Sequence, residues 1–102
     1  MYELINVLAE IELFSGKNMR QTPFFTRYRP AFQFPGASTR ISGRIDLINM
    51  DSFAPGTSGI VHITFIKGMI NNDYFKAGQK FMVSEGGKYD LGKGEILELL
   101  KS

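Results

Sequence analysis

Proline and aromatic residues are concentrated in Thr22–Phe34, which reads TPFFTRYRPAFQF and holds four of the nine phenylalanines of the chain. A proline lies near each end of the stretch. Proline lacks an amide proton and biases its neighbour to an extended conformation, so a helix through this stretch is excluded. The side chains alternate between two faces, as in a half-buried strand. The two predicted faces are Tyr28, Phe32 and Phe34 on one side and Arg27, Arg29 and Gln33 on the other.

Two interpretations of this stretch compete. In the first, it is an aromatic core strand whose charged residues face solvent. In the second, it is a nucleic-acid surface on which arginines are interleaved with stacking rings. We assign the phenylalanines to the core and retain Arg27 and Arg29 as candidate contacts to RNA.

Outward from this stretch, short apolar runs alternate with turns. Gly/Pro-rich turns between short strands are typical of an all-β barrel or sandwich. The first run is ambiguous, because its two glutamates flanked by apolar residues also suit a helix. The last run, Glu95–Leu100, has the pattern of a helical turn but is short for one. The predicted strands are Val7–Leu13, Ile41–Leu47, Ile60–Lys67, Phe81–Val83 and the closing segment Ile96–Leu100.

Two further features of the sequence concern the curvature of a strand and the position of a loop. Gly43 inside the Ile41–Leu47 run predicts a bulge or a close backbone approach, as a tightly curled barrel requires. Gly68–Gly78 is the longest irregular stretch and the expected flexible loop.

Composition predicts one globular domain over residues 1–102, with 43% hydrophobic residues and no cysteine. No apolar run is long enough to cross a bilayer, and the start lacks the profile of a signal peptide, so we expect a cytoplasmic protein without a membrane partner. Charge is unevenly distributed. No acidic residue lies between Glu12 and Asp46, a window that contains six basic residues. A basic window of this kind attracts phosphate or an acidic protein surface if its members share a face, and contributes little if they point in several directions.

The sequence offers little for catalysis. Gly87–Gly94 satisfies G-x-x-x-x-G-K, but a glycine stands where a phosphate-binding loop needs Ser or Thr, and too little chain follows for the required helix. His62 is the single histidine and is expected on the surface without a neighbouring acid. The carboxylates are scattered, which indicates no metal site. We therefore expect no enzyme activity, no nucleotide, no cofactor and no metal.

Several short motifs occur in one order along the chain. Thr22-Pro23-Phe24-Phe25 and Tyr28-Arg29-Pro30 are followed by Ser42-Gly43, Pro55-Gly56, Glu85-Gly86-Gly87 and Gly92-Lys93-Gly94. In order and spacing they resemble the C-terminal (third) domain of elongation factor Tu, and the resemblance covers Ala9 to Leu100. It implies a small closed antiparallel Greek-key barrel of about six strands, in which Thr22–Phe34 belongs to the first long strand and the late glycines to a β-hairpin.

The resemblance also implies a function. In elongation factor Tu this barrel performs no chemistry; it grips the T-stem backbone of aminoacyl-tRNA and contacts other proteins and domains. Matching positions here are Arg20, Ser42, Lys67, Glu85 and Gly86. The chain departs from the family at three places. Gln21 replaces a histidine, Ala31 replaces a glutamine, and the Asn71–Gly78 segment is longer than the family's loop.

Two functions follow as hypotheses. The first is a non-catalytic, translation-related binding module whose face holds tRNA or another structured RNA by its backbone. Its candidate contacts are Arg20, Ser42, Lys67, Glu85, Gly86, Arg27 and Arg29. The second is a protein-interaction module that binds a translation factor, or mimics the elongation factor Tu barrel, without RNA.

Overall fold

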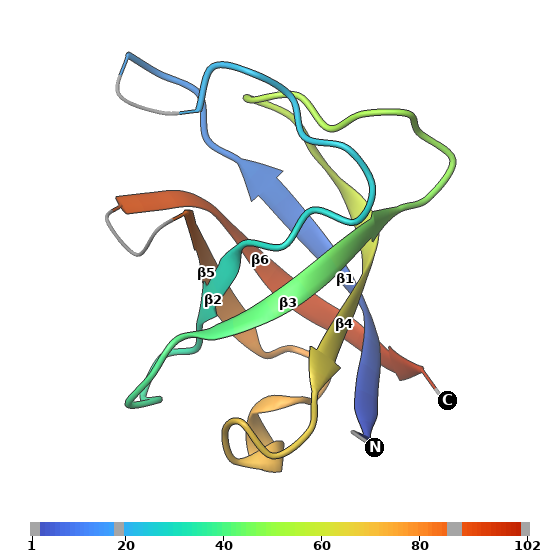
Figure 1. The fold of residues 1–102 in the computed structure, drawn as a ribbon, viewed down its shortest axis with the longest axis vertical. Helices are drawn as coiled ribbons and strands as arrows, with labels where there is room; N and C mark the ends of the chain where they lie inside the picture. The colour runs from blue at the N-terminus through green and yellow to red at the C-terminus, as the bar shows by residue number, and fades with distance from the viewer. Residues whose placement is uncertain (1–2, 18–19, 86–88, 101–102) are drawn as a thin grey trace.

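A computed structural model describes residues 3–17, 20–85 and 89–100, which form six antiparallel strands closed into a barrel (Figure 1). Around the barrel the order is β1-β4-β3-β2-β5-β6. The predicted small closed antiparallel barrel is confirmed. Its elements are β1 (Leu4–Leu13), β2 (Ala31–Gln33), β3 (Ile41–Leu47), β4 (Ser58–Ile66), the 3₁₀ helix η1 (Asn72–Tyr74), β5 (Lys80–Glu85) and β6 (Tyr89–Leu100).

The connectivity is that of a Greek key. Strands β2, β3 and β4 follow one another as antiparallel neighbours, and β4 then pairs with β1. The long connection from β1 to β2 passes over the end of the barrel (Figure 1). Strand β6 pairs with both β1 and β5, which closes the sheet on itself. None of the described residues belongs to a helix long and apolar enough to cross a membrane.

The core is formed by strands whose successive side chains alternate between the interior and the outer surface. In β1, β3 and β4 every second side chain is buried, as the sequence predicts for these three runs. The helical alternative for the first run is therefore excluded. The inward residues of these strands are Val7, Ala9, Ile11 and Leu13, then Ile41 and Ile45, then Val61, Ile63 and Phe65.

Phenylalanine rings fill the interior between these strands. Phe32 meets Phe65 and Phe81 edge-on, with ring centroids 5.0 and 5.4 Å apart. Phe34 lies 5.7 Å from Phe75, which itself lies 5.2 Å from Phe65. Aromatic pairs of this kind add roughly 0.5–1.5 kcal/mol each beyond the area they bury. Phe75 belongs to the predicted flexible loop, and its buried ring anchors that loop in the core.

The Thr22–Phe34 stretch differs from the predicted long strand. Only Ala31–Gln33 is regular strand, and Phe24 and Tyr28 make isolated bridges to Phe53 and Ile45. The backbone turns at Arg27, whose φ of 71° lies in the left-handed region and interrupts the extended run. The sidedness was predicted correctly for Phe32 and Phe34, which are buried, and for Arg27 and Arg29, which are exposed.

The closing segment is strand rather than helical turn, because Glu95–Leu100 belongs to β6 and pairs with β1. The late glycines have a structural role in that pairing. A Cβ on Gly92 would lie 2.3 Å from the carbonyl oxygen of Glu12, and one on Gly94 would lie 2.6 Å from that of Glu10. The described part of the Gly-rich motif thus lies in a strand and does not open a helix. Gly87 falls outside the described residues.

Gly43 makes room for the aromatic core. A Cβ at this position would lie 2.8 Å from ring atoms of both Phe32 and Phe65. The predicted bulge is absent here, and the predicted close approach is not one of another backbone. It is an approach of side-chain rings, and β3 pairs with β4 in unbroken register at this point.

We expect Gly43→Ala to lower the free energy of unfolding by about 1–3 kcal/mol, because the added methyl overpacks the two rings. Ser42→Ala is the matched control, since Ser42 is its exposed neighbour on the same strand. That change should stay within about 0.5 kcal/mol. Chemical denaturation of both variants measures the difference, and equal stability of the two would contradict this account of Gly43.

Candidate nucleic-acid interface

Arg20 is held on all sides by groups of its own chain. Its Nε donates to the carbonyl oxygen of Thr22 at 2.9 Å and Nη2 to that of Pro23 at 3.3 Å. Nη1 donates to Oε2 of Glu85 at 2.9 Å, an ion pair between two predicted RNA contacts. The guanidinium carbon also lies 5.0 Å from the ring centroid of Tyr28, a cation–π distance.

Tyr28 completes this cluster. Its hydroxyl donates to the same Oε2 of Glu85 at 2.9 Å, and its ring stacks on Phe24 with centroids 4.6 Å apart. The cluster ties the segment of residues 20–30 to the end of β5. Arg20 and Glu85, two of the candidate RNA contacts, therefore lie together, but their charges largely satisfy each other and they position the segment that carries Arg27 and Arg29.

The same segment continues alongside β3. The amide of Ile45 donates to the carbonyl oxygen of Tyr28 at 2.7 Å, and Ala31 pairs with Ser42. This register places Arg29 directly opposite Arg44. Like charges that face each other across an antiparallel pair repel, and here the carboxylate of Asp46 compensates the charge of Arg44.

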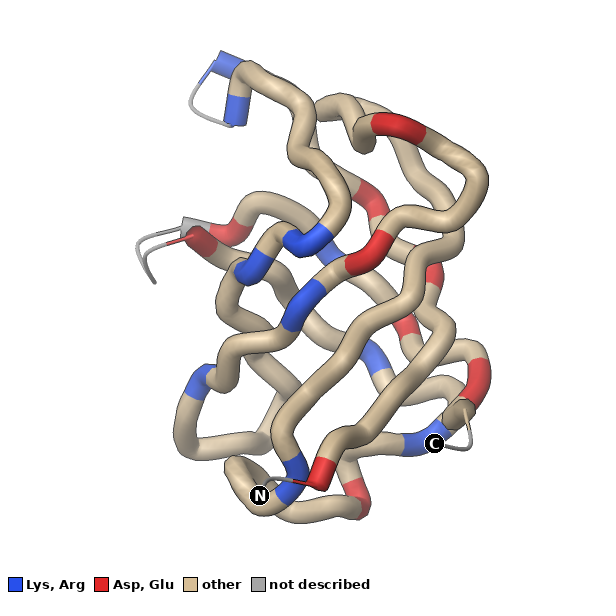
Figure 2. Tube along the Cα trace, turned by 45° about the vertical axis from the view of Figure 1, so that its right-hand side comes forward, with Lys and Arg blue, Asp and Glu red and all other residues tan. Residues whose placement is uncertain are grey.

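Four arginines and one serine form what we call the basic face: Arg27, Arg29, Arg40, Arg44 and Ser42. The inward positions are Ile41, Gly43 and Ile45. They alternate with Arg40, Ser42 and Arg44, whose side chains therefore lie on the outer surface. In Figure 2, blue positions gather where the 20–30 segment passes β3. Arg20, with its acidic partner, and Lys17 lie further along the same connection.

The members of the basic face differ in their partners. Nε of Arg44 donates to Oδ2 of Asp46 at 3.0 Å, so its charge is compensated. Arg27, Arg29 and Arg40 are exposed, and no carboxylate of the described residues pairs with them. Three exposed and uncompensated guanidinium groups are suited to phosphate oxygens, which arginine binds in a bidentate fashion.

Arg27 is held in an unusual conformation. Its φ is 71°, and its amide donates to the carbonyl oxygen of Ile45 at 2.7 Å. A non-glycine residue in this region carries a cost of order 1 kcal/mol and is retained where the surroundings fix it. The hydrogen bond to β3 is that constraint, and it fixes the direction in which the Arg27 side chain leaves the backbone.

Lys67 lies apart from the basic face. It follows β4 at the position next to Glu3, and Nζ pairs with Oε2 of Glu3 at 3.1 Å. Glu85 lies near the other end of β1, whose ten residues span roughly 30 Å. The predicted contacts therefore do not form one surface: Arg27, Arg29 and Ser42 lie together beside the Arg20–Glu85 pair, and Lys67 lies at the far end. Gly86 falls outside the described residues.

His62 does have an acidic neighbour, contrary to the sequence-based expectation. Its Nδ1 lies 4.0 Å from Oδ2 of Asp46, and its Nε2 lies 3.0 Å from Oδ1 of Asn6. The hydroxyl of Thr64 donates to the same Asn6 oxygen at 2.9 Å. Asp46 thus links Arg44 to this half-buried row of polar side chains on β1, β4 and β3. Sequence spacing does not reveal this association between strands.

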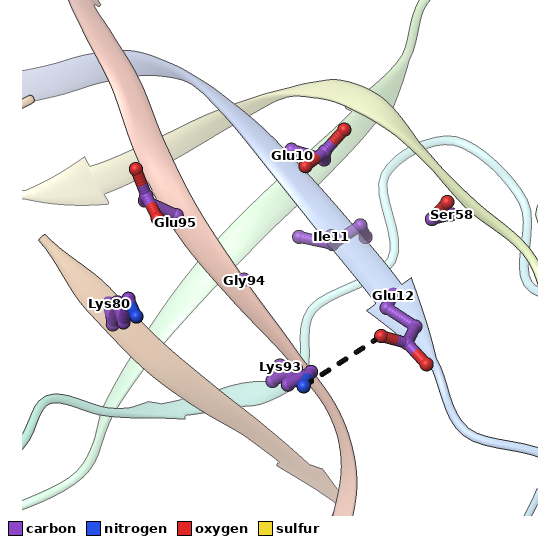
Figure 3. Close-up of a pocket in the computed structure, with 8 residues that line it drawn as sticks. All are labelled: Glu10, Ile11, Glu12, Ser58, Lys80, Lys93, Gly94 and Glu95. Carbon is purple, nitrogen blue, oxygen red and sulfur yellow. Dashed lines mark ion pairs between the residues drawn. The ribbon is translucent and has the colours of Figure 1, made fainter. Parts of the chain in front are cut away.

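A shallow hollow of about 360 Å³ lies on the outer surface of the sheet, over β1, β5 and β6 (Figure 3). Both signs of charge line it. Lys93 pairs with Glu12 at 4.0 Å, while Glu95 faces Glu10 on β1 and Lys80 on β5. This balance of charge does not favour an anionic ligand. Among the described residues no cluster of histidine and carboxylate side chains is arranged to hold a metal ion.

The basic face also contains two residues, Arg40 and Arg44, that the candidate set derived from the sequence omits. The signal for them was the window without acidic residues between Glu12 and Asp46, which contains both. No protein-family model matches the chain.

We expect Arg20 and Glu85 to be energetically coupled. A double-mutant cycle with Arg20→Ala and Glu85→Ala should give a coupling free energy of about 1 kcal/mol, because the pair is only partly exposed and shares the Tyr28 hydroxyl. Arg20→Lys should recover only part of it, since lysine lacks the planar fork that also reaches two carbonyl oxygens. Urea denaturation measures the coupling, and additive effects of the two substitutions would show that the pair does not anchor the segment.

Proposed function

We propose that the protein is a non-catalytic binding module whose basic face holds the phosphate backbone of RNA, with tRNA as the first candidate. One observation carries the proposal: Arg27, Arg29 and Arg40 are exposed and have no carboxylate partner among the described residues. A phosphate group bound to these arginines would supply the negative charge that they lack in the described structure. Cations with a hydroxyl nearby are what a backbone contact requires, and such contacts carry no sequence information.

The resemblance to the C-terminal domain of elongation factor Tu supports the same proposal and suggests a role in translation. The basic face uses Arg27, Arg29 and Ser42 from the predicted contacts and adds Arg40 and Arg44. Arg20 and Glu85 support the segment that presents two of these arginines. Lys67 takes no part, because it lies at the opposite end of β1 and pairs with Glu3.

A protein-interaction module is the second candidate, and a different surface favours it. Around Lys67, several large apolar side chains are exposed: Leu4 at 51%, Met69 at 58% and Leu99 at 46%. Leu4 and Leu99 border a hollow of about 550 Å³ whose lining includes Ile5 and Phe75. An apolar interface there would depend weakly on salt, whereas phosphate contacts weaken steeply as salt is added.

We expect RNA binding to depend on Arg29. Removal of one phosphate contact lowers the slope of log affinity against log salt by about one, which corresponds to roughly a fivefold loss of affinity at moderate salt. Titration of bulk tRNA at several salt concentrations, with a DNA duplex for comparison, measures both quantities for wild type and Arg29→Ala. Lys67→Ala is the matched control, an exposed cation at the far end that should bind like wild type. Equal losses in the two variants would remove the basic face from the proposal.

The substitution Arg27→Gly separates the effect of this residue on stability from its effect on RNA binding. Glycine accepts the left-handed conformation without the Cβ penalty, so the free energy of unfolding should stay level or rise by up to about 1 kcal/mol. The same substitution removes one guanidinium and should weaken tRNA binding severalfold. Thermal unfolding and the tRNA titration are measured on one preparation. Binding as tight as that of wild type would exclude Arg27 from the interface, and a less stable variant would contradict the strain at this position.

A further inference from the structure

Phe25 departs from the rule that the phenylalanines of the aromatic stretch belong to the core. Phe24, Phe32 and Phe34 are at most 2% exposed, whereas Phe25 is 62% exposed. It makes no ring contact with any other aromatic residue in the described part of the chain. Its ring therefore lies mostly in solvent and contributes little to the packing of the core.

The backbone on both sides of Phe25 is fixed. Phe24 exchanges two backbone hydrogen bonds with Phe53, at 3.0 and 2.9 Å. On the other side, the Thr26 hydroxyl donates to Asp46 at 3.3 Å and accepts from the amide of Leu47 at 3.1 Å. With these anchors in place the segment cannot fold the ring into the core, so Phe25 is presented to solvent on a preorganised support.

Exposed residues follow this ring along the same short segment. Phe25, Thr26, Arg27 and Arg29 are all exposed, while Phe24 is buried and Tyr28 half-buried. A ring beside guanidinium groups is the arrangement that proteins use for single-stranded nucleic acid, with bases stacked on the ring and phosphates held by the cations. Paired bases in an A-form helix cannot present a face to such a ring, because their faces are covered by stacking within the helix.

We propose that the RNA bound by the basic face presents an unpaired base, which stacks on Phe25. This inference rests on the proposed RNA binding and specifies its substrate class as RNA with a loop, bulge or free end. The basic face sets affinity through the backbone, and Phe25 sets the preference for unpaired over paired nucleotides.

The test compares three RNAs with the same number of phosphates: an oligouridine, a hairpin with an open loop, and a blunt duplex. Binding is measured at one salt concentration for wild type, Phe25→Ala, Phe25→Tyr and Met69→Ala. Phe25→Tyr keeps the ring, and Met69→Ala removes an apolar side chain of similar exposure near Lys67. Thermal unfolding of each variant confirms that the exposed positions leave the fold intact.

We expect Phe25→Ala to lose at least about fivefold in affinity for the oligouridine and the hairpin, and less than about twofold for the duplex, since stacking is lost only where a base is unpaired. Phe25→Tyr and Met69→Ala should match wild type on all three RNAs. Upfield shifts of the Phe25 ring protons on addition of oligouridine would report stacking directly.

The two proposals fail in different ways. If wild type binds the RNAs but Phe25→Ala matches it, or loses equally on all three, the stacking inference is overturned and backbone binding stands. If wild type binds none of the RNAs at low salt, the proposed RNA function fails and the inference fails with it. An exposed Phe25 that instead anchors a protein partner would give this second result.

Discussion

The interior of this barrel is filled by phenylalanine rings, and the rest of the structure depends on how they fit. A barrel of six strands has little internal space, so large rings fit only where the opposing backbone carries no side chain. Gly43 provides that space beside Phe32 and Phe65, and Gly94 provides it beside Phe81. The same absence of a Cβ lets β6 approach the carbonyl oxygens of β1 and close the sheet. The core therefore depends on both residue types: glycines without a Cβ leave the space that the large phenylalanine rings fill.

A core packed in this way leaves no polar site inside. Apart from Ser84, the fully buried side chains are apolar, as far as the described residues go. Any binding chemistry must therefore lie on the outer surface, at the ends, or on the connections. The long connection between β1 and β2 is where the outer surface becomes distinctive, because its 20–30 segment is fixed by the Arg20–Glu85–Tyr28 cluster and by its pairing with β3.

That segment shows how one sequence pattern can serve both packing and function. Inward rings at Phe24 and Phe32 hold it to the barrel, and outward arginines at Arg27 and Arg29 remain available. The left-handed turn at Arg27 interrupts the strand and changes which side chains face solvent. Arg20, by contrast, is already bound by groups of its own chain, because carbonyl oxygens, a carboxylate and a ring surround its guanidinium group.

Local information in the chain was sufficient for the strands and for the sidedness of β1, β3 and β4, because a period of two residues is a property of consecutive side chains. It left a barrel or a sandwich open, and the closed barrel was predicted from the resemblance. The sequence also reveals the window without acidic residues directly. It does not reveal which residue each charged side chain pairs with. Whether Arg20 meets Glu85, Lys67 meets Glu3, or Arg29 meets no carboxylate depends on strand register and on distant segments brought together by closure. The exposure of Phe25 and the burial of Phe75 have the same origin: both rings look alike in the sequence, and only their position relative to the closed barrel separates a surface ring from a core ring.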